Sequence, residues 1–253
     1  MAAVASVLLD ARYCGPPGSA NGGYAAGRLA RAVLEAAGRP AVGGPWVEVT
    51  LRAPVPLAEP LTVRTEPPAP DAASTLSAVA GPGDLLVAQV RVPEHAPDGA
   101  VPVPPVDLAA AEQAGTRYLG LHVHPFPTCW VCGPQRPPGD GYHLQPGLVD
   151  AETTACVWSV LSGHADADGT LRAEAVWAAL DCPGGWTALA DGRVVLLGRL
   201  TAAVLDLPAV GERCVVMGRR VAEQGRKTFT ATSAYGQDGR LLGHATAVWV
   251  APA

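Results

Sequence analysis

The most informative segment of the sequence is Val176-Trp-Ala-Ala-Leu-Asp-Cys-Pro-Gly-Gly-Trp186. It is apolar apart from one acid, Asp181, and its pattern predicts a helix from about Glu174 to Leu189. Pro183 interrupts that helix, because proline lacks the backbone N–H that the helical ladder needs. The sequence therefore predicts a buried helical segment that is broken beside a single carboxylate.

A second stretch has the same order of residue types. Gly22-Gly-Tyr-Ala-Ala26 resembles Gly184-Gly-Trp-Thr-Ala188, at an offset of 162 residues between positions 22 and 184. The first copy opens a predicted helix over residues 22–37, in which Leu29, Val33 and Ala36 share one face. The chain is thus expected to contain an internal repeat.

Strand-like segments surround both helices. They are predicted at residues 4–9, 46–51, 61–65, 75–80 and 85–92, and again at 143–148, 153–160, 194–204, 213–222, 226–235 and 241–250. A Pro/Ala-rich linker over residues 93–115, with a short helix near 107–114, separates the two sets. We therefore expect an N-terminal half at 1–115 and a C-terminal half at 116–253. Each is an antiparallel sheet around a helix, and the two pair edge to edge.

Composition excludes several classes of protein. The 253 residues are 49% hydrophobic, enough for a sizeable core, and the net charge of −5 argues against a nucleic-acid binder. No apolar run approaches the roughly 20 residues of a membrane span. The beginning of the chain lacks the basic start of a signal peptide, and six scattered cysteines are too sparse for a disulfide scaffold. A cytoplasmic protein with reduced thiols is expected.

The two helical stretches together resemble a known family. Asn21-Gly-Gly-Tyr24, the stretch 176–186 and the loop Thr128-Cys-Trp-Val-Cys-Gly133 with Gly139-Asp-Gly141 resemble the double hot-dog acyl-CoA thioesterases of the thioesterase II type and their thioesterase-like relatives. The resemblance covers nearly the whole chain. It implies an α+β fold of two antiparallel sheets, each wrapping a central helix, related by a pseudo-twofold axis within one chain. Fold alone does not fix function.

Asp181 is the first candidate for catalysis. The resemblance implies that it activates water for attack on a thioester carbonyl, and hydrolysis needs such a base together with donors to the carbonyl oxygen. Gly184, Gly185 and Trp186 are expected to supply those donors and to line the substrate site. The alternative is that Asp181 only caps the helix that follows, with Pro183 in its first turn.

The remaining site residues follow from the same resemblance. In that family a Thr or Ser and a Gln share the water, and the candidates here are Thr201 and Gln224, although a strand threonine is usually just a good β residue. Residues 21–23 (Asn21, Gly22 and Gly23) are expected to bind the thioester or its pantetheine arm. They equally fit a turn before a tightly packed helix.

Four cations flank the turn at residues 221–225. Arg219, Arg220, Arg226 and Lys227 lie on one predicted hairpin, where the arginines could bind the phosphates of coenzyme A. They also fit a solvated hairpin end. Strand alternation would send Arg219 and Arg220 to opposite faces of the sheet.

The pair Cys129-x-x-Cys132 leaves two interpretations open. A closed zinc site needs four ligands, so His122, His124 and His143 would have to complete it. Ordinary loop thiols are the preferred interpretation, and no metal or cofactor is predicted. Cys182 could be a nucleophile but is better explained as a small packed side chain.

The sequence thus predicts a hydrolase of acyl-CoA or another acyl thioester. No phosphate-binding loop, dinucleotide fingerprint or nucleophile elbow is present. The alternative is a non-catalytic module that binds acyl ligands or partners on the same scaffold. Free sheet edges further predict association into a homo-oligomer.

Overall fold

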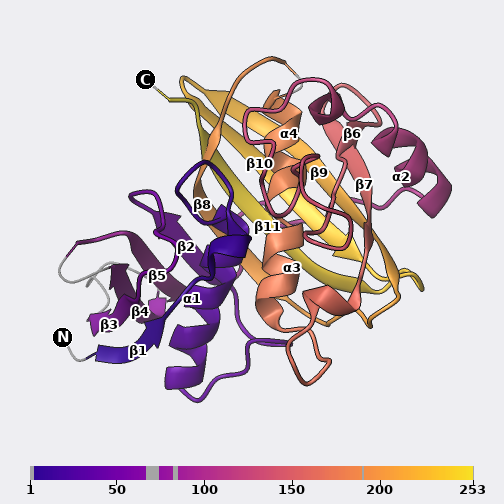
Figure 1. Cartoon of the computed structure of the whole chain (residues 1–253). Coiled ribbons are helices and arrows are strands. Elements are labelled where there is room, and N and C mark those ends of the chain that lie inside the picture. Colours follow the sequence, from indigo (N-terminus) through magenta and orange to yellow (C-terminus); the bar gives the residue numbers. More distant parts are fainter. Residues whose placement is uncertain (1–2, 67–73, 82–84, 190, 253) are drawn as a thin grey trace.

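The computed structural model describes residues 3–66, 74–81, 85–189 and 191–252. Its described strands form one antiparallel sheet in the order β1-β3-β4-β5-β2-β8-β11-β10-β9-β7-β6 (Figure 1). The first half contributes β1 (Ala3–Val7), β2 (Val47–Leu51), β3 (Leu61–Glu66), β4 (Ser74–Gly81) and β5 (Ala88–Pro93). The second half contributes β6 (Gly147–Leu148), β7 (Thr153–Ser159), β8 (Leu196–Val204), β9 (Arg213–Gln224), β10 (Lys227–Tyr235) and β11 (Leu241–Val250).

The strand order confirms the internal repeat. From its outer edge inward the first half runs β1-β3-β4-β5-β2, and the second half runs β7-β9-β10-β11-β8 with the short β6 added outside. The equivalent strands β2 and β8 pair antiparallel at the junction, with Val47 opposite Ala202 and Thr50 opposite Arg199. The expected edge-to-edge pairing is therefore present. It merges the two predicted sheets into one continuous sheet.

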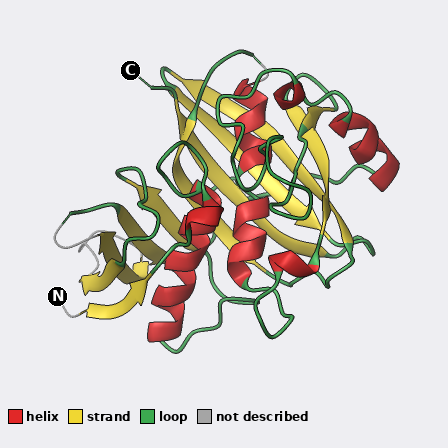
Figure 2. Cartoon of the chain, viewed as in Figure 1, coloured by secondary structure: helices red, strands yellow, loops and turns green. Residues whose placement is uncertain are grey.

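Three helices lie together across one face of this sheet (Figure 2). They are α1 (Gly22–Ala36), α3 (Ala173–Ala179) and α4 (Cys182–Leu189). Helix α1 of the first half packs directly on α3 of the second, and glycines permit the close approach. A Cβ atom at Gly27 would lie 2.7 Å from the Cα atom of Glu174, and one at Gly23 would lie 2.5 Å from the Cβ atom of Asp181. The two halves thus share a tightly packed helical layer.

The break between α3 and α4 occurs where Pro183 requires it. The predicted helix over 174–189 is divided at Leu180 and Asp181. In an uninterrupted helix Pro183 would have no N–H to donate to the carbonyl of residue 179, and its ring would clash with that carbonyl. Carbonyls near the break find partners on the sheet. Leu180 accepts from the Thr232 hydroxyl at 2.8 Å, and Pro183 accepts from the Thr154 hydroxyl at 2.8 Å. Asp181 is thereby held between two helices.

The linker before residue 116 packs on the opposite face of the second half's sheet. Its helix α2 (Leu108–Gly115) buries Ala111 and Ala114 in a small core with residues of β7, β9 and β10. The Val103 N–H donates to the Ser233 hydroxyl at 2.9 Å, and its carbonyl accepts from the Tyr235 hydroxyl at 2.7 Å. This segment therefore covers the C-terminal half, although it precedes the expected boundary at 115.

Two predicted strands are shorter in the structure. The segment expected at 85–92 becomes β5 only from Ala88, and most of 143–148 is a loop. The loop's backbone bonds to another loop instead of a strand, since the N–H groups of Tyr142 and Leu144 donate to the carbonyls of Trp130 and Val131. Three short 3-10 helices, η1 (Ala11–Tyr13), η2 (Leu119–Leu121) and η3 (Ser162–His164), complete the described elements. None of the described helices combines the length and hydropathy needed to cross a membrane.

Candidate functional site

A cavity of about 430 Å³ lies where the two halves meet. The starts of α1 and α4, the loop after η2 and the chain around the junction strands form its wall. The wall comprises residues 15–17, 19–22, 51–55, 195–198 and 249–252 together with His124, Phe126, Cys129, Cys132, Asp181, Cys182, Gly185, Trp186, Leu189 and Arg226. Most of these side chains are apolar, so the few polar groups among them carry the chemistry of the site.

Asp181 is buried in this wall and bonds to the first half. Its Oδ2 atom accepts from the Asn21 amide at 2.8 Å and from the Gly23 N–H at 2.9 Å. The Gly23 N–H belongs to the first turn of α1, whose partial positive charge favours an anion. Asp181 thus sits at the start of the other half's helix, and its side chain does not simply cap α4.

The second carboxylate oxygen of Asp181 has no hydrogen-bond partner among the described residues. The residue is only 3% exposed, and burial raises the pKa of Asp181 to about 7, with the Cys129 side chain adding to the rise. Hydrogen bonds from Gly23 and Asn21 act in the opposite direction. One oxygen is therefore fixed by protein donors, while the other is buried without a described partner in a residue that lines the cavity.

Asn21 holds the two helix starts together. It is the N-cap of α1, where its Oδ1 atom accepts from the Tyr24 N–H at 2.9 Å, and its amide donates to Asp181. The same amide nitrogen lies 3.8 Å from the Cys129 sulfur and 3.9 Å from the Cys182 sulfur. A single side chain thereby connects the cap of one helix with the polar groups of the other half.

The glycines of the two helix starts face different neighbours. Gly22 lines the cavity, and no described group accepts a hydrogen bond from its N–H. Gly184 faces the sheet instead, since a Cβ atom there would lie 2.6 Å from the Thr230 hydroxyl oxygen. Gly185 lines the cavity, but as the fourth residue of α4 its N–H falls within the helical ladder. The available backbone donor is thus at Gly22 and not at Gly184 or Gly185.

Thr201 and Gln224 lie away from the cavity wall. Thr201 is buried in β8, opposite Glu48 of β2 and Thr246 of β11. Gln224 is exposed at the end of β9, beside the turn to β10. The structure therefore does not bring these two residues together with Asp181, and the predicted trio around one water is not assembled.

The hairpin cations are also separated. Arg226 lines the cavity, whereas Arg219 contacts the Thr153 hydroxyl and Arg220 is paired with Asp191 and Glu223. A β-bulge in the pairing of β9 with β10, between Phe229 and Thr230, lies among these residues. Trp186 lines the cavity as expected.

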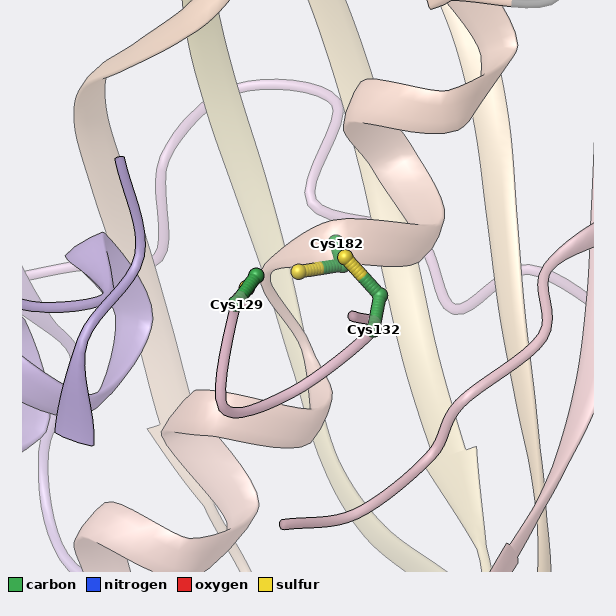
Figure 3. Close-up of side chains that lie close together, drawn as sticks. All are labelled: Cys129, Cys132 and Cys182. Carbon is green, nitrogen blue, oxygen red and sulfur yellow. The ribbon is translucent and has the colours of Figure 1, made fainter. Parts of the chain in front are cut away.

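Three cysteine side chains lie close together (Figure 3), and all three residues line the cavity. The sulfur atoms of Cys129, Cys132 and Cys182 all lie within 4.8 Å of one another, and all three side chains are buried. Hydrogen bonds from the thiol of Cys132 and, to a smaller extent, from that of Cys182 lower the pKa of Cys129. The hydrogen bond with Cys129 raises the pKa of Cys182. Cys182 reaches this cluster across 50 positions of sequence, and the sequence pattern around it carries no signal of that contact.

The three candidate histidines do not all lie at the cysteine cluster. The Nε2 atom of His124 lies 3.5 Å from the Cys132 sulfur, and His124 lines the cavity. His122 is exposed, and His143 is half-buried with its ring against the Pro137 carbonyl. Of the three candidates that the sequence offered beside the cysteine pair, the structure brings only His124 to it.

Comparisons with known proteins give the fold. No family model matches the chain, and no curated protein matches its sequence. Among solved structures, a conserved hot-dog fold protein of unknown function from Alicyclobacillus acidocaldarius superposes with a TM-score of 0.64 at 16% identity, covering 98% of this chain and 92% of that one. The tesB protein of Mycobacterium avium subs. paratuberculosis gives a TM-score of 0.63 at 10% identity, over 98% and 92%.

A third likeness is to an acyl-CoA thioesterase II, TesB2, from Mycobacterium marinum. It has a TM-score of 0.57 at 12% identity and covers 92% of this chain and 90% of that one. The agreement extends over both halves in each case, so it confirms the predicted architecture as a whole. At these identities the likeness concerns the fold and not the reaction.

Proposed function

We propose that this chain, which has the double hot-dog fold, hydrolyses acyl thioesters, with acyl-CoA as the substrate class. One observation carries the proposal. Asp181 is a buried carboxylate at an apolar cavity, with one oxygen fixed by Asn21 and Gly23 and the other without a described partner. A group held in this way is positioned to accept a proton from a water molecule in the cavity. Release of free thiol from acyl-CoA tests the proposal.

The hydrolytic step needs three functions from the site. A water on the free oxygen of Asp181 would attack the thioester carbonyl carbon and give its proton to the carboxylate. The N–H of Gly22, at the start of α1, would donate to the carbonyl oxygen as negative charge develops there. The thiolate of the pantetheine arm then leaves and takes up the proton. The apolar wall around Trp186 and Leu197 would hold the acyl chain and limit competing water.

Two cations at the cavity fit the phosphates of coenzyme A. Arg52 and Arg226 line the cavity and are exposed, and neither takes part in an ion pair with another described residue. Arg52 comes from the first half, where it contacts Gln89, and Arg226 comes from the β9–β10 turn of the second half. Planar guanidinium groups from both sides would bind phosphate oxygens through paired N–H donors.

Arg226→Ala is expected to raise KM for acyl-CoA by about tenfold and to leave kcat unchanged, because one charge-assisted hydrogen bond to a phosphate contributes roughly that factor. The measurement is steady-state thiol release over a range of acyl-CoA concentrations. An S-acyl pantetheine, which lacks the phosphates, is compared in parallel. Its KM should be the same for the parent and the variant.

Arg219→Ala is the matched control for this experiment. Arg219 is exposed on the same hairpin but does not line the cavity. The KM of the Arg219→Ala variant for acyl-CoA should therefore match that of the parent. Equal increases in KM for acyl-CoA and acyl pantetheine would assign Arg226 to the pantetheine or acyl part of the substrate. Equal effects of the two arginine variants would remove phosphate binding from the proposal.

A second function is favoured by a different observation. Thr201 and Gln224, which the family resemblance places beside the reacting water, do not line the cavity. A chain that kept the scaffold without this pair would bind acyl thioesters as a non-catalytic module. It would show saturable binding of acyl-CoA in a thermal-shift titration with no release of thiol from any chain length.

A further inference from the structure

Three sulfur atoms converge where the loop carrying Cys129 and Cys132 meets the start of α4 (Figure 3). A zinc ion bound by thiolates at about 2.3 Å in tetrahedral geometry holds its sulfur ligands about 3.8 Å apart. The sulfurs of Cys129, Cys132 and Cys182 already lie within 4.8 Å of one another. We propose that these three cysteines bind one Zn²⁺ ion and that the fourth position of the metal faces the cavity.

The backbone of the loop is shaped to present both of its sulfurs on one side. The Gly133 N–H donates to the Cys129 carbonyl at 2.8 Å, which closes a tight turn around the Cys129-x-x-Cys132 pair. A Cβ atom at Gly133 would lie 2.5 Å from the backbone N and O atoms of Cys129, so only glycine fits this turn. Cys182 completes the set as the first residue of α4.

His124 is positioned to support the metal ligands without being one of them. The backbone N–H of Phe126 donates to its Nδ1 atom at 2.9 Å, so Nδ1 is the acceptor and Nε2 carries the proton. That Nε2–H group faces the Cys132 sulfur at 3.5 Å. Metal-bound thiolates are commonly stabilised by such outer hydrogen bonds, and Asn21 offers a second one from its amide.

The fourth position therefore remains for a small ligand. All three cysteines line the cavity that also contains Asp181, so a water molecule or a substrate atom can complete the tetrahedron there. Three protein ligands with one open position is the arrangement of zinc sites that interact with substrates, whereas closed structural sites use four protein ligands. A disulfide would use only two of the three convergent sulfurs.

Metal content of the full-length protein tests this site directly. Protein purified under reducing conditions should contain about one zinc per chain by elemental analysis, or bind about one when the reduced apoprotein is titrated with Zn²⁺. Cys182→Ser should lose the metal, and Cys156→Ser, which changes a buried cysteine outside the cluster, should keep it. Cys132→Ala serves as a second variant if Cys182→Ser does not fold.

Cobalt substitution of the parent protein reports the ligands without any variant. The Co²⁺ form should show thiolate charge-transfer absorption and the intense visible bands of tetrahedral cobalt, and a small exogenous thiol should shift those bands by entering the open position. His124→Ala should keep the metal and the tetrahedral spectrum, since histidine acts here as a hydrogen-bond donor. Loss of metal in His124→Ala would instead make His124 the fourth ligand and close the site.

Several results would overturn the proposal. A reduced apoprotein that binds neither Zn²⁺ nor Co²⁺ has no such site. A disulfide between two of the three cysteines in protein that still binds no metal after reduction would assign the cluster to redox chemistry. Retention of the metal in both Cys182→Ser and Cys132→Ala would place the ion elsewhere. None of these measurements depends on thioester hydrolysis, so failure here leaves the proposed reaction to its own tests.

Discussion

Asp181→Asn is expected to lower kcat for acyl-CoA hydrolysis by about 10²- to 10⁴-fold, the range that a positioned general base contributes. The asparagine oxygen can still accept hydrogen bonds from the Asn21 amide and the Gly23 N–H, so the contact between the halves is kept. What is lost is the proton acceptor at the free oxygen. Thiol release under saturating substrate measures kcat, and thermal unfolding verifies the fold.

Glu174→Gln is the control for this variant. Glu174 is also a buried carboxylate, about two turns before the break in the same helical segment. It pairs with Arg28 and Arg31 of α1 and does not line the cavity. It should retain hydrolysis whatever its effect on stability. Full turnover by Asp181→Asn would remove Asp181 from the mechanism. Equal losses in both variants would mean that α1–α3 packing, and not a base at the cavity, controls the rate.

Gly27→Ala is expected to destabilise the protein by about 1–3 kcal/mol, the usual cost of an extra methyl group in a packed interface. The new Cβ atom would lie 2.7 Å from the Cα atom of Glu174, where backbone must move. Because α1 belongs to the first half and α3 to the second, the two halves would be pushed apart. The melting temperature should fall by roughly 2–12 °C in a chain of this length.

Gly115→Ala provides a matched comparison. Gly115 is also a buried helical glycine, but its nearest neighbour to a new Cβ atom is the Gln145 carbonyl oxygen at 3.5 Å, an ordinary contact. This variant should be neutral or slightly stabilised, since alanine is the better helix former. Equal melting temperatures for the parent, Gly27→Ala and Gly115→Ala would contradict the close packing of α1 on α3.

Much of the architecture could be predicted because it is a property of local patterns and their repetition. Both Gly-Gly-aromatic stretches lie in helices, and the strand sets that follow them occupy equivalent positions in the sheet. Pro183 located the helix break from its chemistry alone. Asp181 stood out because it is the one acid in an apolar helical stretch, and the structure places it at the cavity.

The positions of Thr201, Gln224 and the hairpin arginines could not be predicted in the same way. Which face a strand residue presents depends on register, and one bulge changes it for every residue beyond. The pairing of β9 with β10 has such a bulge between Phe229 and Thr230. The sequence shows which residues lie on the hairpin but not which of them reach the cavity.

The cysteine cluster illustrates a different limit. The Cys129-x-x-Cys132 pair is visible in the sequence. The third cysteine of the cluster, Cys182, lies 50 positions after Cys132 and next to Asp181, the candidate base. Only the packing of the loop on the start of α4 brings Cys182 to the pair. The role of His124 likewise depends on the backbone N–H of Phe126, which fixes the proton on one ring nitrogen.

The decisive measurement is thiol release by the parent protein from a panel of acyl-CoAs, from acetyl to palmitoyl and including an aromatic acyl group. We expect saturable release that depends on the acyl group, because the apolar wall of the cavity should distinguish the chains that it holds. Absence of release from every substrate, with acyl-CoA binding still detected by thermal shift, would contradict hydrolysis and establish the cavity as a binding site.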